Sequence, residues 1–500
     1  MLGGRLPHVQ PRTILIAATV IGLALRLIDL ANPRNDWDEM TYAIVARTMM
    51  QGELPYTGAF DHKPIGLYYV FALFFSMFGY SVFTIRLIAI AAVILTVLLL
   101  KDVVAQYVGP ARRPTAFAAV MFLAICGSFG NNGEATNTEI VAMPVIAAWW
   151  RMACLQPPSM WLALGALVAF GAQINYLCGA ILAASTAVLW ARECAPLSNR
   201  AAFAGAAASA LKSLLAFLLV STVMLLPLII TGSFIEYLNL QYAYLSVYRV
   251  PLESGSVLRA IKAFAYPNLL TIALLATCAR RGWSWSRGTS AADSLRVHAF
   301  AAWGITLLVI APSNHFYPHY FNFGVVPAAL ITMMLIEQLD EPTLVRARFG
   351  LAVAAGILLW MGAWAIGIRD LRDDLKPQRE LLAVSDRIKH LTVPGDRMLL
   401  FDVDPTLYVL TDTEPASRFT AQRMHILAHA FLAKMGTNTR QEIAKALARR
   451  PALVVACFDK WTTIEYESFM IASAGGDYVP ERWGDYSACG HPLWALRRSH

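Results

Sequence analysis

A short segment near the N-terminus combines carboxylates with a lysine. Asp36, Asp38 and Glu39 come at the expected start of a helix, and Lys63 follows in the same polar segment, residues 32–64. A plain acidic helix start on a solvated loop is one interpretation, because anions suit the first turn of a helix. The other is chemical: a carboxylate at a membrane face can deprotonate a hydroxyl while a nearby cation holds a phosphate.

The elements that must position these residues are membrane spans. Of the 500 residues, 57% are hydrophobic and 15% are charged, whereas a typical soluble domain has roughly 25% charged residues. Several uninterrupted apolar stretches reach the roughly 20 residues that cross a bilayer. The sequence therefore predicts a polytopic α-helical membrane protein, and it excludes an ordinary soluble enzyme, a disordered chain and a disulfide-stapled secreted module.

Apolar runs predict about eleven spans. They lie near residues 13–31, 82–107, 114–130, 139–154, 161–189 (two short spans), 206–231, a segment ending at Arg280, 298–312, 321–338 and 349–368. Residues 65–78 are apolar but short, which favours a place along the interface. Arginines recur in alternate loops, so the positive-inside rule puts the N-terminus in the cytoplasm. The net charge of 41 − 33 = +8 is therefore interpreted as a determinant of membrane orientation. The sequence has no stripe of alternating basic and aromatic residues that would suggest nucleic-acid binding.

The composition changes after residue 368. Charge density rises and long apolar runs end, so residues 369–500 are expected to form a small α/β domain outside the membrane, and residues 1–368 a transmembrane domain. Residues 371–390 and 439–450 favour helices, and residues 397–402 and 451–456 favour buried strands. The seven cysteines show no CxxC pair and are interpreted as small buried hydrophobes.

The first outer loop, residues 32–80, resembles that of the GT-C glycosyltransferases. Its closest likeness is to the bacterial branch related to protein mannosyltransferases and lipid A aminoarabinose transferases. The matching residues, in order, are Asp38-Glu39, Tyr42, Arg47, Gly52, Pro55-Tyr56, Asp61-His62-Lys63-Pro64 and Tyr68-Tyr69. Weaker matches continue at Arg86, Thr138-Glu139 and Pro318-His319-Tyr320, so the resemblance covers about the first 340 residues.

The resemblance implies transfer of a sugar from a polyprenyl-phosphate carrier to an acceptor hydroxyl on the extracytoplasmic face. It makes Asp38, in the pair with Glu39, the general base, with Asp36 as the fallback. It places Lys63 near the carrier phosphate. The remaining candidates for carrier or substrate binding are His62, Tyr42, Glu139, His319, Tyr320 and Asn175. For Glu139 and its neighbour Glu134, a simple acid at the start of a span is an equal alternative.

One position departs from the family pattern. Relatives often have a lysine at the polar break between the two short spans, where this chain has Gln173-Ile174-Asn175. An asparagine can donate a hydrogen bond but cannot neutralise a phosphate. Another cation then substitutes, with Arg249, Arg259 and His319 as candidates, or donor binding differs.

Three further features leave alternatives open. His315 and His319 have a spacing that suits metal ligands, but Pro318 opposes a regular helix; no metal ligand is assigned, and a divalent metal ion stays open because relatives differ in metal use. The tyrosines at 237, 242, 244 and 248 form either an interfacial aromatic belt or a stacking surface for lipid or sugar. Residues 415–419 recur in look-alikes without a chemical explanation; a turn that stabilises the fold is favoured over a role in shaping the acceptor site.

The sequence is compatible with three classes of function. A membrane glycosyltransferase, transferring a hexose or a pentose, is favoured because the acids cluster outside the spans. A transporter or flippase of lipid-linked envelope intermediates would need intramembrane charges and repeated halves, and a non-catalytic scaffold would act through residues 369–500. The expected partners are the bilayer of a bacterial inner membrane, a polyprenyl-phosphate sugar and a glycan, lipid or protein acceptor, with a periplasmic C-terminal domain.

Overall fold

The computed structural model describes residues 10–32, 36–193, 200–248, 255–279, 291–339, 348–363, 375–420, 429–457, 463–486 and 491–499. These residues pack into two compact units. The first unit comprises residues 1–29, 88–224 and 250–368, and the second comprises residues 30–87, 225–249 and 369–500. The second unit therefore combines the first outer loop with the C-terminal residues.

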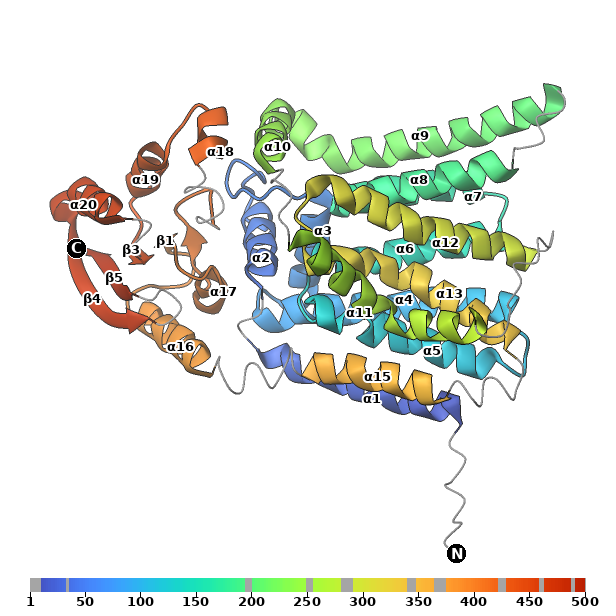
Figure 1. Cartoon of the computed structure of the whole chain (residues 1–500). Coiled ribbons are helices and arrows are strands. Elements are labelled where there is room, and N and C mark those ends of the chain that lie inside the picture. The colour runs from blue at the N-terminus through green and yellow to red at the C-terminus, as the bar shows by residue number, and fades with distance from the viewer. Residues whose placement is uncertain are drawn as a thin grey trace, which may run out of the picture. The chain divides into compact units, whose positions relative to one another are not determined.

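The first unit is built from apolar helices that run side by side along a common direction (Figure 1). Helix α13 lies at its centre and packs against α5, α11 and α12, while α1 packs against α5 and α15. The elements are α1 (Pro11–Ile28), α4 (Val82–Tyr107), α5 (Arg113–Cys126), η2 (Phe129–Asn131), α6 (Thr138–Leu155), α7 (Met160–Ile174), α8 (Tyr176–Glu193), α9 (Arg200–Ile230), α11 (Ser256–Ala279), α12 (Ala291–Ile310), η3 (Ala311–Ser313), η4 (Pro318–Gly324), α13 (Val325–Gln338) and α15 (Arg348–Ala363). The first turn and a half of α4, residues 82–87, and the end of α9, residues 225–230, belong to the second unit.

Helix lengths agree only partly with the expected spans. Within the described residues, seven helical segments are long and apolar enough to cross a membrane. Four more expected spans are present as shorter apolar helices, at 160–174, 176–192, 297–310 and 352–362. The membrane-spanning helical architecture is thus confirmed, while the count of eleven spans stays a prediction.

The second unit begins with a short helical layer. Helix α2 (Trp37–Met50) packs against α3 (Ile65–Phe78), the apolar segment expected at the interface. A 3-10 turn, η1 (Asp29–Ala31), precedes α2, and α10 (Phe234–Tyr248) follows α9 along the chain. Helix α10 packs against α18 (His429–Lys434) of the C-terminal segment.

The C-terminal residues form the expected α/β fold around a five-stranded sheet. The strand order is β2-β1-β3-β5-β4, with β1 parallel to β2 and β3, and with β5 antiparallel to β3 and β4. The buried strands β1 and β3 were expected from sequence, but β4 and β5 were not. The elements are α16 (Leu375–Lys389), β1 (Arg397–Phe401), α17 (Thr406–Thr411), β2 (Glu414–Pro415), α18, α19 (Thr439–Ala448), β3 (Leu453–Cys457), α20 (Thr463–Ala474), η7 (Gly475–Asp477), β4 (Tyr478–Tyr486) and β5 (His491–Arg498).

Candidate functional site

The acidic pattern forms the N-terminus of α2. The Asp36 side chain accepts a hydrogen bond from the Asp38 backbone N–H at 3.1 Å, and the Glu39 carboxylate accepts one from the Asp36 N–H at 3.2 Å. This reciprocal arrangement is a capping box, which satisfies N–H groups that a helix start leaves unpaired. Asp36 therefore holds the helix start, and Asp38 lies half-buried in the first turn.

Glu39 is engaged in a second interaction. Its carboxylate forms an ion pair with the guanidinium of Arg86 on α4, and both side chains are almost completely buried. Arg86 also donates to the Asn32 carbonyl at 3.3 Å. Losing one partner of such a pair would leave a buried charge uncompensated. Glu39 and Arg86 thus fix the position of the α2 start, which carries Asp38.

The loop before α3 is held rigidly around Lys63. Asp61 Oδ2 accepts from the Lys63 backbone N–H at 3.3 Å and lies 3.0 Å from the Tyr68 hydroxyl. The Lys63 carbonyl accepts from the Tyr56 hydroxyl at 2.9 Å and lies 3.1 Å from that of Tyr68. The Lys63 side chain itself is buried. Within the part of the chain that the structure describes, no hydrogen bond or ion pair involves its ammonium group.

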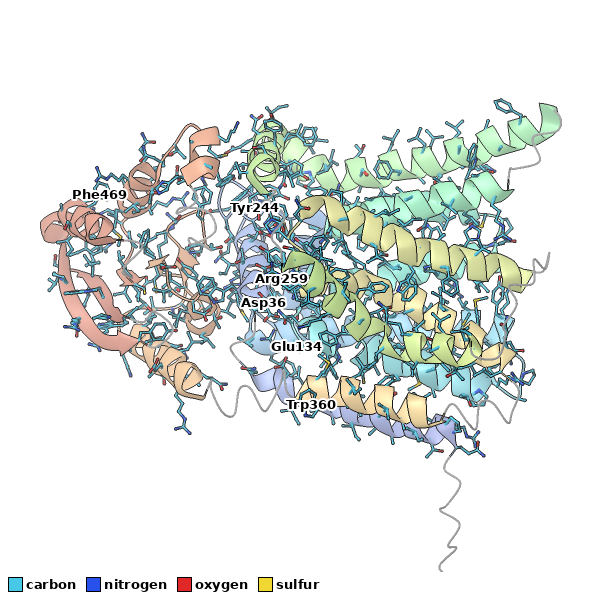
Figure 2. All side chains as sticks on the ribbon, viewed as in Figure 1. Asp36, Glu134, Tyr244, Arg259, Trp360 and Phe469 are labelled. Carbon is cyan, nitrogen blue, oxygen red and sulfur yellow. The ribbon has the colours of Figure 1, made fainter. Side chains whose placement is uncertain are left out.

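Aromatic rings of α10 cover this loop. The His62 ring stacks on Tyr244 with ring centroids 4.2 Å apart, and His62 Nδ1 lies 3.0 Å from Asp61 Oδ1. Tyr237 lies on Tyr56 with centroids 4.7 Å apart. Figure 2 labels Tyr244 on α10. Tyr248 also faces His62, with centroids 6.1 Å apart, so three of the four tyrosines of this segment lie against the loop that contains Lys63.

The predicted site residue Tyr42 packs between two helices of the second unit. It is buried on α2 and meets Phe71 of α3 edge to face, with centroids 6.0 Å apart. Further along α2, Arg47 pairs with Asp412 at 3.2 Å and lies over the Tyr80 ring. Burial raises the pKa of Tyr80 above its ordinary value, so this phenol stays neutral. Contacts along α2, from Tyr42 to Arg47, therefore fix this helix within the second unit.

Residues 415–419 attach the C-terminal segment to the loop that contains Lys63. The Phe60 backbone N–H donates to the Arg418 carbonyl at 2.6 Å, and the Phe60 ring packs on Phe419 and Phe431 with centroids 5.6 and 5.5 Å apart. Arg418 also lies 3.4 Å from Glu236 of α10. The recurring Ser-Arg-Phe pattern thus stabilises the fold, and its partner, the Phe60 segment, could not be predicted from the sequence.

In the first unit, the predicted residues Glu139 and Asn175 meet at the ends of α6 and α7. Asn175 Nδ2 donates to Thr138 Oγ1 at 2.8 Å and to Glu139 Oε1 at 3.2 Å, and all three side chains are buried. Asn175 Oδ1 accepts from the Leu177 N–H at 2.8 Å and so starts α8. Glu139 Oε2 and Gln173 Oε1 have no hydrogen-bond partner among the described residues.

His315, in the segment before η4, and His319, in η4, lie in an aromatic ladder. The Tyr317 ring is stacked between His315 and His319, at centroid distances of 4.9 and 5.6 Å, and His319 meets Tyr320 edge to face. Tyr320 is buried in a small core with Ala263. Within the described residues, no group of three or more His, Cys, Asp or Glu could hold a metal ion.

Three further charged residues, Glu134, Arg259 and Arg249, were candidates for substrate contacts. Glu134 and Arg259 lie at the same end of the helices of the first unit, the end that also carries Trp360 (Figure 2). Arg259 is exposed in the first turn of α11 and donates to Ser256 Oγ at 3.4 Å. Arg249, the remaining candidate to replace the family lysine, lies outside the described residues.

Two features lie away from these residues. An apolar cavity of about 420 Å³ is lined by α7, α8 and α9, including Trp161 and Trp190, at the helix ends opposite Asn175. In the C-terminal fold, Cys457 of β3 forms a disulfide, whose partner lies outside the described residues. The four cysteines at 126, 154, 178 and 278 are free and buried.

The chain is similar to known membrane glycosyltransferases, in part of its sequence and in its fold. Residues 62–226 match the family model described as dolichyl-phosphate-mannose-protein mannosyltransferase. Two crystal structures of ArnT from Cupriavidus metallidurans resemble the chain over 96% of its length and 97% of theirs, each at 12% identity. The TM-score is 0.62 for the form bound to undecaprenyl phosphate and 0.57 for the apo form. The chain has an ArnT-like fold.

The ArnT-like fold and the mannosyltransferase match confirm the resemblance to GT-C glycosyltransferases. The matched residues include Lys63, Arg86, Glu139 and Asn175, and they begin after Asp38. Among curated protein sequences, none matches the chain. The roles of the individual residues consequently rest on the geometry described above and on the motif order.

Proposed function

We propose that the chain is an integral-membrane glycosyltransferase that moves a sugar from a polyprenyl-phosphate carrier to an acceptor hydroxyl on the extracytoplasmic face. One observation carries this proposal: the buried Lys63 side chain has no protein counter-ion among the described residues, although its backbone is fixed by Asp61 and Tyr56. The ammonium of this largely buried side chain can therefore bind an anion through charge-assisted hydrogen bonds, and a phosphate would supply that anion. A solved structure of similar fold is bound to undecaprenyl phosphate.

The proposed reaction uses Asp38 as base and Lys63 as electrostatic partner. Asp38 takes the proton from the acceptor hydroxyl as its oxygen attacks the anomeric carbon of the donor sugar. The bond between that carbon and the phosphate oxygen breaks, and the electron pair leaves on the polyprenyl phosphate. Lys63 stabilises the charge that grows on the phosphate. A single direct displacement of this kind inverts the anomeric centre.

Supporting contacts give the surrounding residues distinct roles. Glu39 and Arg86 fix the helix start, with Asp36 as its cap, and His62 is held beside Asp61 under Tyr244. We assign Glu139, Asn175, His319 and Tyr320 to sugar or acceptor contacts. Whether the sugar is a hexose or a pentose, and whether the acceptor is a glycan, a lipid or a protein, depends on contacts with the bound substrates.

The disulfide at Cys457 supports the proposed location of the C-terminal domain. Disulfides persist in oxidising compartments such as the bacterial periplasm and are rare in the cytosol. Together with the arginine-rich loops, this favours a multi-pass protein of a bacterial inner membrane with a cytoplasmic N-terminus and a periplasmic C-terminal domain.

The decisive experiment is Asp38→Asn in the full-length protein, reconstituted with a panel of undecaprenyl-phosphate-linked hexoses and pentoses. We expect loss of transfer and loss of release of free undecaprenyl phosphate, with unchanged thermal unfolding. Asp102→Asn is the matched control, because this partly exposed aspartate pairs with Arg151 on α6. Near-normal turnover by Asp38→Asn would overturn the base assignment. Movement of the intact lipid-linked sugar across the bilayer without release of free carrier would favour a transporter or flippase.

A further inference from the structure

The apolar cavity of the first unit lies between three neighbouring helices, α7, α8 and α9 (Figure 1). Its volume of about 420 Å³ falls within the roughly 300–1,000 Å³ of ligand pockets. The side chains around it are small or apolar, and they include Trp161 and Val168 of α7, Ala187 and Trp190 of α8, and Leu214 and Phe217 of α9. The site described above uses none of these residues.

Close contacts hold the three helices apart at the cavity. A Cβ atom at Gly165 would collide with the Ser213 carbonyl, so the backbones of α7 and α9 touch at this point. Small residues permit such close approach of helices in membranes. On the other side, the Trp190 indole N–H donates to the Ala206 carbonyl at 2.9 Å and joins α8 to α9. Because the helices are fixed in this way, the cavity does not close by collapse of its wall.

Polar groups in the wall have partners within the protein. The Thr186 hydroxyl donates to the Leu182 carbonyl at 2.8 Å and accepts from the Trp149 indole at 3.0 Å. The Trp190 indole N–H is engaged by Ala206. A ligand would therefore meet mainly hydrocarbon, and apolar cavities exclude water. The lining suits a hydrocarbon chain and offers little to a sugar or a phosphate.

The cavity also borders the lipid-facing surface of the protein. Helix α9 is a span whose apolar side chains are mostly exposed on the protein, and Leu214, which lines the cavity, is 53% exposed. On α8, Ala183 and Ala187 line the cavity and are exposed as well. Lipid chains surround a membrane span on its exposed faces. They are the molecules that can enter the cavity from the side.

The depth of the cavity matches one leaflet. Trp161 lies in the first turn of α7 and Trp190 in the last turn of α8, and tryptophan is enriched where a membrane meets water. From Trp161 to Val168 the wall is about 10 Å long, at about 1.5 Å per residue. The hydrocarbon core of a bilayer is roughly 30 Å thick, so the cavity remains within the leaflet at the Trp161 end.

This placement distinguishes a phospholipid from the polyprenyl carrier. Asn175, which we assign to substrate contacts, follows the last residue of α7 and lies at the opposite end of that helix. A lipid whose head group is at the Trp161 end can occupy the whole depth of the cavity. A chain that starts beside Asn175 must first cross the other half of the span. The occupant is therefore a lipid of the leaflet at the Trp161 end.

We propose that the cavity between α7, α8 and α9 binds one acyl chain of a phospholipid from this leaflet. The bound chain supplies the dispersion contacts that an empty cavity lacks, and it stabilises the packing of α9 on α7 and α8. The proposal goes beyond the proposed function and does not depend on it, because it requires only that these helices span a membrane.

Native mass spectrometry of the full chain, washed repeatedly in mild detergent, tests this proposal. Ala187→Phe places a ring in the cavity, and Ala183→Leu fills it from a second position in case the first variant fails to fold. Ala208→Phe is the matched control, because Ala208 is exposed on α9 and does not line the cavity. We expect one phospholipid on the unsubstituted chain and on the control, and at least severalfold less on the filled variants.

Three outcomes of this experiment would overturn the proposal. They are the absence of a phospholipid from the unsubstituted chain, equal retention by the filled variants and the control, and an adduct with the mass of a polyprenyl phosphate in place of the phospholipid. Each outcome is read without any sugar transfer, so it leaves the proposed function untouched.

A second measurement tests the effect of the bound lipid on stability. Phosphatidylethanolamine added to the delipidated chain should raise its Tm, because a ligand that binds only the folded state stabilises it. The Ala208→Phe control should respond equally. Ala187→Phe should show little further rise, because its ring occupies the place of the acyl chain. An equal rise in Tm for Ala187→Phe and the control would reject the cavity as the binding site.

Discussion

The Glu39 carboxylate is paired with the Arg86 guanidinium, and both side chains are almost completely shielded from solvent. The pair joins the start of α2 to the start of α4. Because Glu39 also accepts from the Asp36 N–H, the backbone around Asp38 is held from two sides. A general base needs a fixed position near the proton that it removes, and this arrangement supplies that position.

Removing Arg86 should destabilise the protein strongly. Arg86→Met leaves the Glu39 charge buried without its partner, which costs about 3–5 kcal/mol for such pairs. Arg151→Met is the matched control, because its pair with Asp102 is partly exposed and such pairs contribute about 0–1 kcal/mol. Thermal unfolding in nanodiscs measures both.

The double variant Glu39→Leu, Arg86→Met refines this test. It removes both charges, so it should unfold at a higher temperature than Arg86→Met alone. If Arg86→Met unfolded at the same temperature as Arg151→Met, the pair would have no part in fixing the helix start.

Lys63 should contribute charge rather than volume to carrier binding. Loss of one charge-assisted hydrogen bond, about 1.5–3 kcal/mol, corresponds to an affinity for undecaprenyl phosphate lower by about tenfold to a hundredfold. We therefore expect that loss for Lys63→Gln and a smaller one for Lys63→Arg, measured by calorimetric titration. Lys389→Gln on the exposed part of α16 is the control. Equal affinities for the glutamine variant and the control would remove Lys63 from the site.

Local sequence patterns were sufficient to predict the membrane architecture and the α2 start. Each of these features can be recognised from residues that are close together in the sequence. They are the long apolar runs, the acids at Asp36 and Glu39, and the short buried strands β1 and β3. The order of residues in the first outer loop indicated the GT-C likeness for the same reason. What these patterns predict is the kind of element and the chemistry that it carries.

Contacts between distant segments could not be predicted in this way. Glu39 was expected to act chemically, but its pairing with Arg86 depends on how α2 and α4 pack. The role of Phe419 depends on Phe60, which lies far away in sequence. Strand β4 was missed because charged residues interrupt its sequence. Strand β5 has an apolar run of only four residues, 493–496, and its place in the sheet depends on antiparallel pairing with β3 and β4.

The link between residues 415–419 and the first outer loop should depend on the aromatic contact. Phe419 is fully buried against Phe60 and Phe431, and Phe→Ala at such positions costs about 3–5 kcal/mol. The control Arg450→Gln should cost about 0–1 kcal/mol, because both members of its pair with Asp477 are exposed. Thermal unfolding and limited proteolysis of the second unit measure the difference, and equal effects would contradict it.

Asn175 should be needed as a donor to Glu139. Asn175→Ala removes that donor and the contact that starts α8, which we expect to cost about 1–3 kcal/mol. Asn175→Asp should be worse, because it places a second carboxylate beside the Glu139 carboxylate. Asn239→Ala, at an exposed position of α10, is the control in thermal unfolding. An aspartate variant as stable as the control would show that Glu139 does not depend on Asn175.

The Cys457 disulfide should report the compartment of the C-terminal domain. A structural disulfide contributes about 2–4 kcal/mol, so Cys457→Ser should lower the unfolding temperature of this domain and leave the helices of the first unit in place. In denatured protein from the membrane, a thiol-reactive polyethylene glycol should modify five of the seven cysteines before reduction and all seven after it. A strain without periplasmic thiol oxidase should abolish that difference. Modification of all seven without reduction would place the domain in the reducing cytoplasm, and the sugar transfer would then have to occur on the other face.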